Sequence, residues 1–367
     1  MLKILLRAFF YCARGFKDVH GYVLVICSGQ LFAWSDKFST SDEKMGDKGN
    51  TRNVALVLRR KQHGNDVDDS LEAIQLDEPL RCKGYQVVAL DWQQTSRLQL
   101  LKAVHELQPA LLVLSSYCLT GRPHFQPSLW FLHRLKQISP SSKFVGMMWD
   151  TCSKKFWKTL PTENVFDLFV AMENRLSGSM HCPANVRHKW LFQFASYAEP
   201  FPIKPLPKDI DVFFSGQIDS YRSNRAKYVE RLISEGYGMH IYTSNRATQF
   251  NQSDYFEMLG RSRIVINFSF SVDMHQLKGR VFEAMLAGAL LLESRNAQTE
   301  SIFSNGVDYV AFDDEADLLK KIRYYLEHPE AAAAIALSGR QKTLQNYTAE
   351  HCFNNVLDSL ELPRFFE

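Results

Sequence analysis

Short, almost continuously apolar runs alternate with amphipathic segments along most of this 367-residue chain. The runs of the first half are NVALVLR (53–59), YQVVALD (85–91), ALLVLSS (110–116), KFVGMMWD (143–150) and DLFVAME (167–173). Those of the second half are DVFFSG (211–216), MHIYTS (239–244), IVINFSF (264–270), ALLLES (289–294) and DYVAFD (308–313). Strands of this kind are buried on both faces, so their alternation with helices predicts parallel sheets covered on both sides.

A proline-rich stretch, AEPFPIKPLPKD (198–209), separates the two sets of runs. Four prolines in so short a span exclude a helix or a central strand, and the length of the chain favours two domains. We therefore expect an α/β protein with two doubly wound, Rossmann-like domains that face a cleft. The predicted parts are an N-terminal extension and linker (1–52), a first domain (53–199), a linker (200–208), a second domain (209–350) and a helical tail (351–367).

Composition excludes one class of partner and suggests a compartment. The formal net charge is only +3 and no long basic block occurs, so binding to nucleic acid is not expected. Seven dispersed cysteines without a C-x-x-C pair indicate reduced thiols and a cytoplasmic protein.

The first 17 residues, MLKILLRAFFYCARGFK, combine apolar and basic side chains. The apolar run is shorter than the roughly 20 residues that span a bilayer. Two interpretations stay open: a helix that lies on a membrane surface, or a loosely packed extension ahead of the first domain.

The segment HQLKGRVFEAMLAGALLLES (275–294) carries the most chemistry. It follows the apolar run 264–270, and a loop is expected over 272–278. A helix is expected over 279–287, with Gly288 ending it. The beginning of this helix is therefore expected just outside the carboxyl end of a strand.

Charged residues gather at that helix start. Lys278, the Gly279 backbone and Arg280 would meet free N–H groups and a positive helix end, a combination that suits phosphate. Glu283 lies one turn further on, where a carboxylate can accept hydrogen bonds from the two hydroxyls of a ribose. The alternative is a simple surface pair between Arg280 and Glu283 at i and i+3.

Asp150 ends the apolar run 143–150, where a strand is expected to open into the cleft. A carboxylate there can accept the proton of an attacking hydroxyl. The alternative is that Asp150 caps the following helix.

No metal site is expected. The Asp-x-Asp pairs at 66–68 and 209–211 lie before a helix and before a strand, whereas a metal that holds phosphate groups needs such a pair directly after a strand. Positive side chains and the helix start would stabilise a bound phosphate instead.

Two motifs, FFSGQIDSYR (213–222) and GRVFEAMLAGALLLES (279–294), resemble the nucleotide-sugar-binding domain of GT-B glycosyltransferases. Within that fold the chain is most similar to group 1 proteins of the spore-maturation-protein-like type. The resemblance covers about residues 209–350, and the first half matches in strand order and apolar pattern.

The resemblance implies roles for individual residues. Glu283 matches the second carboxylate of a Glu-x7-Glu pair, which contacts the ribose, and His275 stands where the first, sugar-binding Glu is expected. Gly216 and Arg222 match the Gly and Lys of a diphosphate-binding loop, in which Gln217 replaces an Arg. Arg225 is interpreted as a surface charge on the next helix.

The resemblance implies a metal-independent glycosyltransferase. It would transfer a sugar from a nucleotide diphosphate sugar, its donor substrate, to a hydroxyl of an unknown glycan, lipid or protein, without a cofactor. The alternative suggested by His275 and Gln217 is an inactive nucleotide-sugar-binding or scaffold protein of the same fold. A third hypothesis is a two-domain epimerase.

Overall fold

The computed structural model describes most of the two predicted domains. The described residues are 53–59, 72–115, 128–148, 165–171, 190–192, 201, 206–216, 218, 223–237, 239–242, 252–268, 270–271, 274–275 and 277–366. The predicted extension and linker over 1–52 lies outside them.

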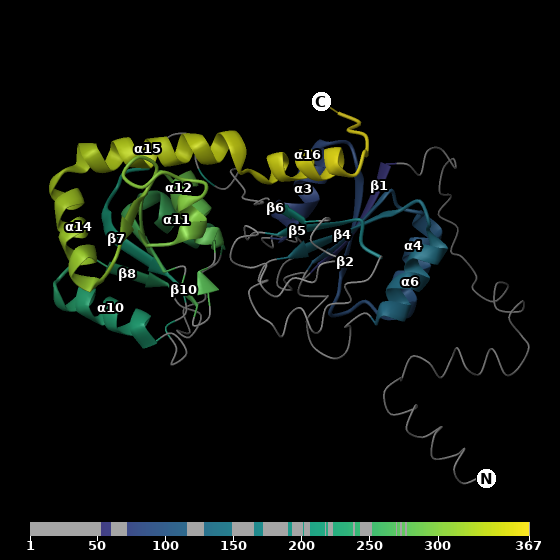
Figure 1. Ribbon diagram of the computed structural model, residues 1–367, viewed down its shortest axis with the longest axis horizontal. Helices are drawn as coiled ribbons and strands as arrows, with labels where there is room; N and C mark the ends of the chain where they lie inside the picture. Colours follow the sequence, from purple (N-terminus) through teal and green to yellow (C-terminus); the bar gives the residue numbers. More distant parts are fainter. Residues whose placement is uncertain are drawn as a thin grey trace, which may run out of the picture.

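The first lobe contains a parallel six-stranded sheet in the order β2-β1-β3-β4-β5-β6 (Figure 1). Its strands are β1 Val54–Arg59, β2 Gln86–Asp91, β3 Leu111–Ser115, β4 Lys143–Met148, β5 Leu168–Ala171 and β6 Trp190–Phe192. Its helices are η2 Ala73–Asp77, α3 Glu78–Cys82, α4 Arg97–Leu107 and α6 Leu129–Ile138. The first five strands are those predicted, whereas β6 is too short to give a pattern.

The second lobe contains a parallel five-stranded sheet in the order β13-β12-β9-β7-β8. Its strands are β7 Ile210–Ser215, β8 Met239–Tyr242, β9 Ser262–Asn267, β12 Leu290–Ser294 and β13 Val310–Phe312. Its helices are α10 Ser223–Ser234, α11 Gln252–Arg261, α12 Gly279–Leu286, α13 Ala297–Glu300, α14 Glu315–Glu327 and α15 Pro329–Asn346. The expected loop 272–278 differs, because a short antiparallel hairpin of β10 Phe270–Ser271 and β11 Met274–His275 begins it.

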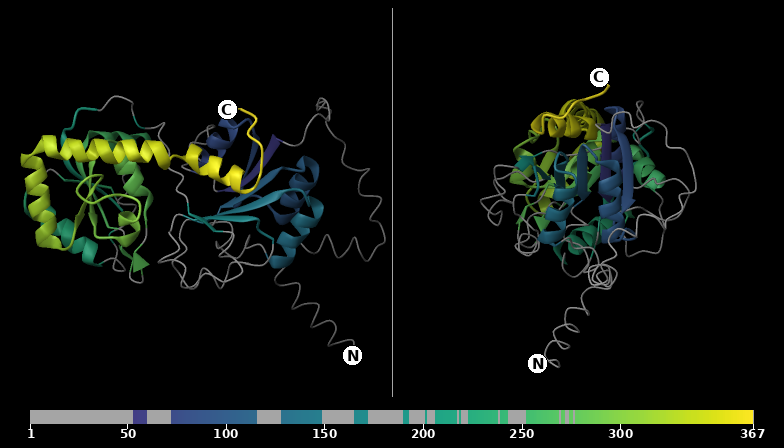
Figure 2. Two further views of the ribbon diagram at one scale, coloured as in Figure 1. Left: turned by 45° about the horizontal axis from the view of Figure 1, so that its top comes forward. Right: turned by 90° about the vertical axis from the view of Figure 1, so that its right-hand side faces the viewer.

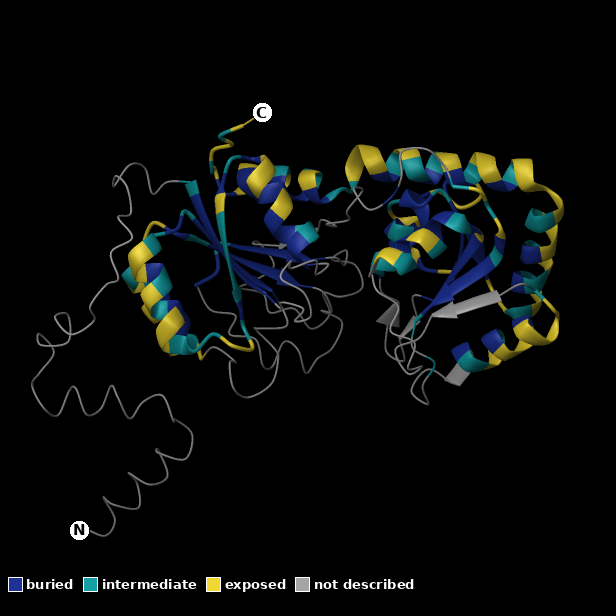
Figure 3. Ribbon diagram, turned by 180° about the vertical axis from the view of Figure 1, so that it is seen from behind, coloured by how far each residue is buried: buried dark blue, intermediate teal, exposed yellow. Residues whose placement is uncertain are grey.

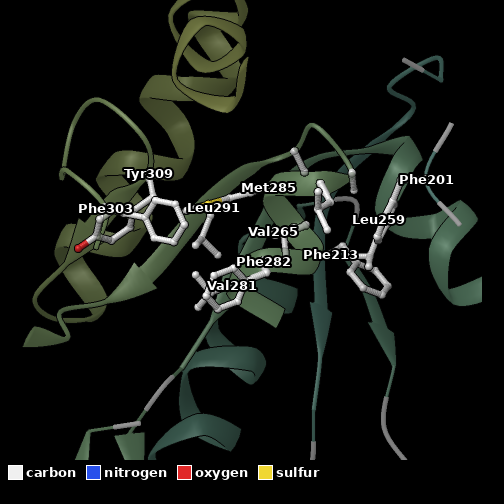
Figure 4. Packing of buried hydrophobic residues seen from close by; sticks show 14 of the residues in the cluster. Phe201, Phe213, Leu259, Val265, Val281, Phe282, Met285, Leu291, Phe303 and Tyr309 are labelled. Atoms are coloured by element: carbon white, nitrogen blue, oxygen red, sulfur yellow. The ribbon is translucent and has the colours of Figure 1, made fainter. Parts of the chain in front are cut away.

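Each sheet has an apolar core on both faces, and the strands are the most deeply buried elements (Figure 3). In the first lobe, α4 and α6 pack on one face, and α3 packs on the other. In the second lobe, α11 and α12 cover one face while α10 and α14 cover the other. Figure 4 shows side chains of α12 against those of the strands, among them Phe282, Val265 and Phe213. The prediction of two doubly wound α/β domains is confirmed.

Local sequence explains several helix boundaries. Ser96 and Gln99 form a reciprocal capping box, which determines where α4 begins. Pro79 lies in the first turn of α3, and the preceding turn, η2, is a wide π-helical one. A proline is tolerated at this place, because the N–H groups in the first turn of a helix have no partner within the helix.

The last helix, α16 Ala349–Ser359, belongs to the core of the first lobe although it follows the whole second lobe in sequence (Figures 1 and 2). Its Phe353 side chain is fully buried against the first sheet. Lys83 donates to Glu350 at 2.8 Å, and the Tyr85 hydroxyl donates to the Pro363 carbonyl at 2.8 Å. The chain therefore crosses between the lobes a second time, after α15.

The strand orders place a topological switch point in each sheet. β1 lies between β2 and β3, and β7 lies between β8 and β9. The next strand in sequence is therefore on one side of β1 or β7, and the strand after that is on the other side. In open parallel sheets ligands bind at the carboxyl ends of the strands beside such a point. A ligand is therefore expected at the carboxyl ends of β7 and β9 or at those of β1 and β3.

Candidate functional site

Helix α12 presents a polar face beside the second switch point. Lys278 is its N-cap with extended backbone angles, and the helix runs over Gly279–Leu286. Val281, Phe282, Ala284, Met285 and Leu286 are buried, whereas Gly279, Arg280 and Glu283 are partly exposed. Gly288 follows with φ +65°, and its N–H donates to the Met285 carbonyl at 2.9 Å, which ends the helix as predicted.

Arg280 is tied to the carboxyl end of β9. Its Nε donates to Asn267 Oδ1 at 3.2 Å, and Asn267 Nδ2 donates to Glu293 Oε1 at 2.9 Å. Asn267 and Glu293 are completely buried and lie opposite each other on adjacent strands. The Asn267 amide thus orients the Arg280 guanidinium, and the buried Glu293 carboxylate in turn holds the amide in place.

Gly216 follows β7 and lies next to two arginines. A Cβ atom at Gly216 would lie 3.2 Å from Arg225 Nη1 and 3.7 Å from Arg280 Cζ. The Gly216 backbone therefore has two guanidinium groups close by. Its φ of +152° also favours glycine over any other residue.

The interpretation of Arg225 as a surface charge is wrong. Its side chain is only 4% exposed, and Nη2 donates to the Phe268 carbonyl at 2.9 Å. The guanidinium also lies over the rings of Phe214 and Phe268, at 5.9 and 5.7 Å from their centroids. Helix α10 turns Arg225 inward, and a single charged residue near a helix start gives no sign of that direction.

Glu283 accepts a hydrogen bond from the Tyr255 hydroxyl of α11. The Tyr255 oxygen also lies 3.3 Å from Ser215 Oγ at the end of β7. Burial, followed by the negative charge of Glu283 and its hydrogen bond, raises the pKa of Tyr255 well above the ordinary value. The phenol is therefore a permanent donor to Glu283. Arg280 and Glu283 each have a partner on another element, so they are more than a surface pair.

The first switch point carries a second group of buried polar side chains. Arg59, at the end of β1, donates to both carboxylate oxygens of Asp77 at 2.9 and 2.6 Å. Ser115, at the end of β3, donates to Glu72 at 2.5 Å. All four side chains are buried. Ile74 of η2 lies between Glu72 and Asp77 in sequence, and it packs against the core of the second lobe.

The predicted site residues fall into three groups. The structure brings Gly216, Arg280 and Glu283 together at the carboxyl ends of β7 and β9, with Lys278 and Gly279 at the adjoining helix start. Asp150 and Arg222 lie outside the described residues, and for His275 the structure describes the strand β11 but no side-chain contacts.

Three further residues of this site escaped prediction from sequence: Tyr255, Asn267 and Arg225. Asn267 left a usable signal, because it is a polar residue inside the apolar run IVINFSF. Tyr255 left none, since an aromatic residue in an amphipathic helix is ordinarily a core residue.

The Asp-x-Asp pair at 209–211 has arginine partners. Arg261 donates to both Asp209 oxygens at 2.9 and 2.6 Å, and Arg263 lies 3.3 Å from an Asp211 oxygen. Among the described residues, no three His, Cys, Asp or Glu side chains are grouped so that they could hold a metal ion. Within the same part of the chain, no helix has the length and apolar character needed to cross a bilayer.

Part of the chain matches a known family, and its fold matches solved structures. Residues 222–358 match the family described as "Glycosyl transferase-like". No curated protein sequence matches the chain significantly.

Among solved structures, the Anabaena protein Alr3699/HepE in complex with UDP and glucose is similar, with a TM-score of 0.56 and 11% identity, covering 84% of this chain and 99% of that one. A glycosyltransferase from Rickettsia africae gives a TM-score of 0.56 and 11% identity, covering 85% and 99%. An α1,3-fucosyltransferase is similar with a TM-score of 0.51 and 13% identity, and the match covers 88% of this chain and 92% of that one.

At these identities the likeness concerns the fold, and it extends over both lobes. Residues 222–358 of this chain thus match a glycosyl transferase-like family, and the two lobes together have a fold similar to that of solved two-domain glycosyltransferases.

Proposed function

We propose that the protein is a glycosyltransferase that moves a sugar from a nucleotide diphosphate sugar to an acceptor hydroxyl. The observation that carries the proposal is the convergence of Gly216, Arg225, Arg280 and Glu283 at the second switch point. Three of these four residues lie inside the segment that matches the glycosyl transferase-like family. A solved protein of similar fold binds UDP and glucose, which is consistent with such a donor.

Two kinds of side chain would hold the nucleotide of the donor: positive ones at the diphosphate and a carboxylate at the ribose. The diphosphate would lie against the Gly216 turn, where the absence of a side chain lets its oxygens approach Arg225, Arg280 and the start of α12. Glu283 would accept hydrogen bonds from the ribose hydroxyls. Arg222, Lys278 and the Gly279 N–H are proposed as further diphosphate contacts, and His275 as a contact of the donor sugar.

The same positive groups account for the chemistry. As the bond between the anomeric carbon and the diphosphate oxygen breaks, the diphosphate leaves with the electron pair and gains negative charge. Arg225 and Arg280 are held in place by their own hydrogen bonds, so they can stabilise this charge without reorganising. We propose that this charge stabilisation requires neither a metal ion nor a cofactor.

The acceptor would approach from the first lobe. There the buried polar groups around Arg59 and Ser115 lie at the carboxyl ends of two strands, and β4, which Asp150 follows closely in sequence, is the next strand of the sheet. Asp150 is proposed to take the acceptor's proton as the oxygen bonds to the anomeric carbon. Asp150→Asn is expected to lower turnover at unchanged donor affinity, and unchanged turnover would remove Asp150 from this role.

The acceptor itself is proposed to be a glycan, a lipid or a protein. Residues 1–17 are proposed to contact a membrane surface, since their lysines and arginines accompany apolar side chains. Sedimentation with anionic vesicles, comparing the full chain with one lacking residues 1–17, tests that contact. Equal sedimentation of both would contradict it.

A donor panel tests the main proposal. Isothermal titration with nucleoside diphosphates and their sugar conjugates is expected to show binding to a subset, and incubation with candidate acceptors is expected to release the nucleoside diphosphate. Glu283→Ala should weaken binding by about 1 to 3 kcal/mol, because charged hydrogen bonds are lost. Absence of binding to every member of the panel would refute the proposal.

The alternative function is nucleotide-sugar binding without transfer. It is suggested by His275 and Gln217, which occupy positions where the family resemblance implies Glu and Arg. A nucleotide-sugar-binding protein without transfer activity would bind the donor in the same titration. It would release no nucleoside diphosphate with any acceptor. Binding without turnover would therefore favour this alternative.

A further inference from the structure

Tyr255 links three elements of the site through one hydroxyl group. It lies on α11, its hydroxyl donates to Glu283 Oε2 on α12, and its oxygen is 3.3 Å from Ser215 Oγ at the end of β7. A phenol has a single proton, and that proton is used on Glu283. The Ser215 hydroxyl must therefore donate to the phenol, which gives a directed chain from Ser215 through Tyr255 to Glu283.

The Tyr255 side chain, in the middle of this series of hydrogen bonds, is held in place by its neighbours. The Tyr255 ring packs against Phe213 at 6.1 Å and Phe256 at 5.5 Å between centroids, so the ring has little freedom. Burial and the charge of Glu283 raise the pKa of Tyr255, so its proton stays on at any ordinary pH. Hydrogen bonds in series polarise one another, and the bond that Glu283 receives is strengthened by the one from Ser215.

Glu283 has a competing partner close by. Arg280 precedes Glu283 by three residues on the same partly exposed face of α12. Its positive charge lies close enough to oppose the rise in the pKa of Tyr255. Without the bond from Tyr255, the carboxylate could turn toward Arg280 as an ordinary i, i+3 pair. Arg280 and Glu283 would then be less available to bind a ligand, because each would neutralise the charge of the other.

We propose that Tyr255 is a positioning residue that holds the Glu283 carboxylate in the orientation needed to accept hydrogen bonds from the two ribose hydroxyls of the donor. This inference rests on the proposed function, in which Glu283 contacts the ribose. A carboxylate with a fixed plane can receive two neighbouring hydroxyls at once, and a rotating one cannot. Tyr255 therefore determines how strongly the site prefers a ribonucleotide to a 2′-deoxyribonucleotide.

Tyr255→Phe separates this role from a packing role, since the ring is retained and one oxygen is removed. The full chain is titrated with the nucleoside diphosphate that it binds best and with the 2′-deoxy form of the same nucleotide. The wild type is expected to prefer the ribose form by about tenfold or more, the usual effect of one well-placed hydrogen bond. In Tyr255→Phe the affinity for the ribose form should fall and that for the deoxy form should hardly change, so the preference shrinks to about threefold or less.

Three further variants test the interpretation. Tyr325→Phe, on α14 in the same domain, removes a hydroxyl from another partly buried tyrosine and should leave both affinities at the wild-type values. In a Glu283→Ala background, Tyr255→Phe should have no further effect on the preference, because the group that it positions is gone. Ser215→Ala should reduce the preference less than Tyr255→Phe does.

The outcomes are distinct. If the wild type binds a nucleoside diphosphate and Tyr255→Phe keeps the full preference for ribose, Tyr255 does not position Glu283. An equal loss of affinity for both forms would mean a merely structural role and would also overturn the inference. If the wild type binds no nucleoside diphosphate at all, the proposed function fails first and this inference fails with it.

Discussion

At the scale of single residues, Gly216 shows how backbone and site depend on each other. Its φ of +152° strains any residue with a side chain, and a Cβ there would lie 3.2 Å from both Arg225 Nη1 and Phe214 Cζ. Gly216→Ala is therefore expected to displace the Arg225 guanidinium and to cost about 1 to 3 kcal/mol of unfolding free energy. Nucleoside diphosphate affinity should fall about tenfold through loss of a charged contact, as titration would measure.

Gly236 provides the matched control, because it has φ +78° but a Cβ atom there would meet no other atom within 4 Å. Gly236→Ala should carry the backbone strain of about 1 kcal/mol alone and leave nucleotide affinity unchanged. Wild-type affinity in Gly216→Ala would contradict the assignment of this turn to the diphosphate.

At the scale of elements, α15 is docked onto the second lobe by a buried carboxylate. Asp308 accepts hydrogen bonds from Ser338 and Lys342 of α15, each at 2.8 Å, and from the Ser304 N–H at 2.8 Å. Burial alone would raise the pKa of Asp308, but these hydrogen bonds outweigh it and lower the pKa below its ordinary value. The docking is therefore strongest when the carboxylate is ionised.

Asp308→Asn is expected to lower the unfolding free energy at pH 7 by about 1 to 3 kcal/mol. A carboxyl with a lowered folded pKa contributes stability that is complete above its unfolded pKa of about 3.9 and disappears as the pH falls through the folded value. Urea unfolding should therefore show the gap between wild type and variant closing toward pH 3.

Asp313→Asn is the control for Asp308→Asn, since Asp313 also pairs with a basic residue, Arg295, but is exposed and lies outside α15. Exposed ion pairs contribute little, so this substitution should change the stability hardly at all at either pH. A gap for Asp308→Asn that stays constant with pH would show that its carboxylate charge does not dock α15.

At the scale of the whole molecule, α16 joins the end of the chain to the first lobe. Phe353 and Cys352 are fully buried in the core beneath the first sheet, and burial raises the pKa of the Cys352 thiol. Phe353→Ala should destabilise the first lobe by about 3 to 5 kcal/mol, the usual cost of removing a buried aromatic side chain. Alkylation of Cys352, followed by mass spectrometry of its peptide, should become faster because α16 opens more often.

Leu344→Ala serves as the comparison, since Leu344 is exposed in the last turn of α15, shortly before α16. It should leave the protection of Cys352 as it is. Equal protection in Phe353→Ala would mean that α16 is not required to complete the first lobe.

Much of the architecture follows from local sequence alone. The runs that became β1 to β5 and β7 to β9 are apolar enough to require burial on both faces, which prescribes parallel sheets between layers of helices. The boundaries of α12 follow from RVFEAML and from Gly288, since helix periodicity and a glycine stop are properties of neighbouring residues. Lys278, Arg280 and Glu283 could be placed near the site because they lie on that one helix.

The partners of those residues were decided by the tertiary structure. Tyr255 and Glu283 are 28 residues apart, and Asn267 and Glu293 are 26 apart, so nothing in either local pattern indicates that they meet. Arg225 has the local sequence of a surface charge, and only the packing of its helix against Phe214 and Phe268 turns it inward. Periodicity determines which face of an element is buried, whereas contacts between distant segments depend on strand order and on how helices pack, and these are properties of the whole chain.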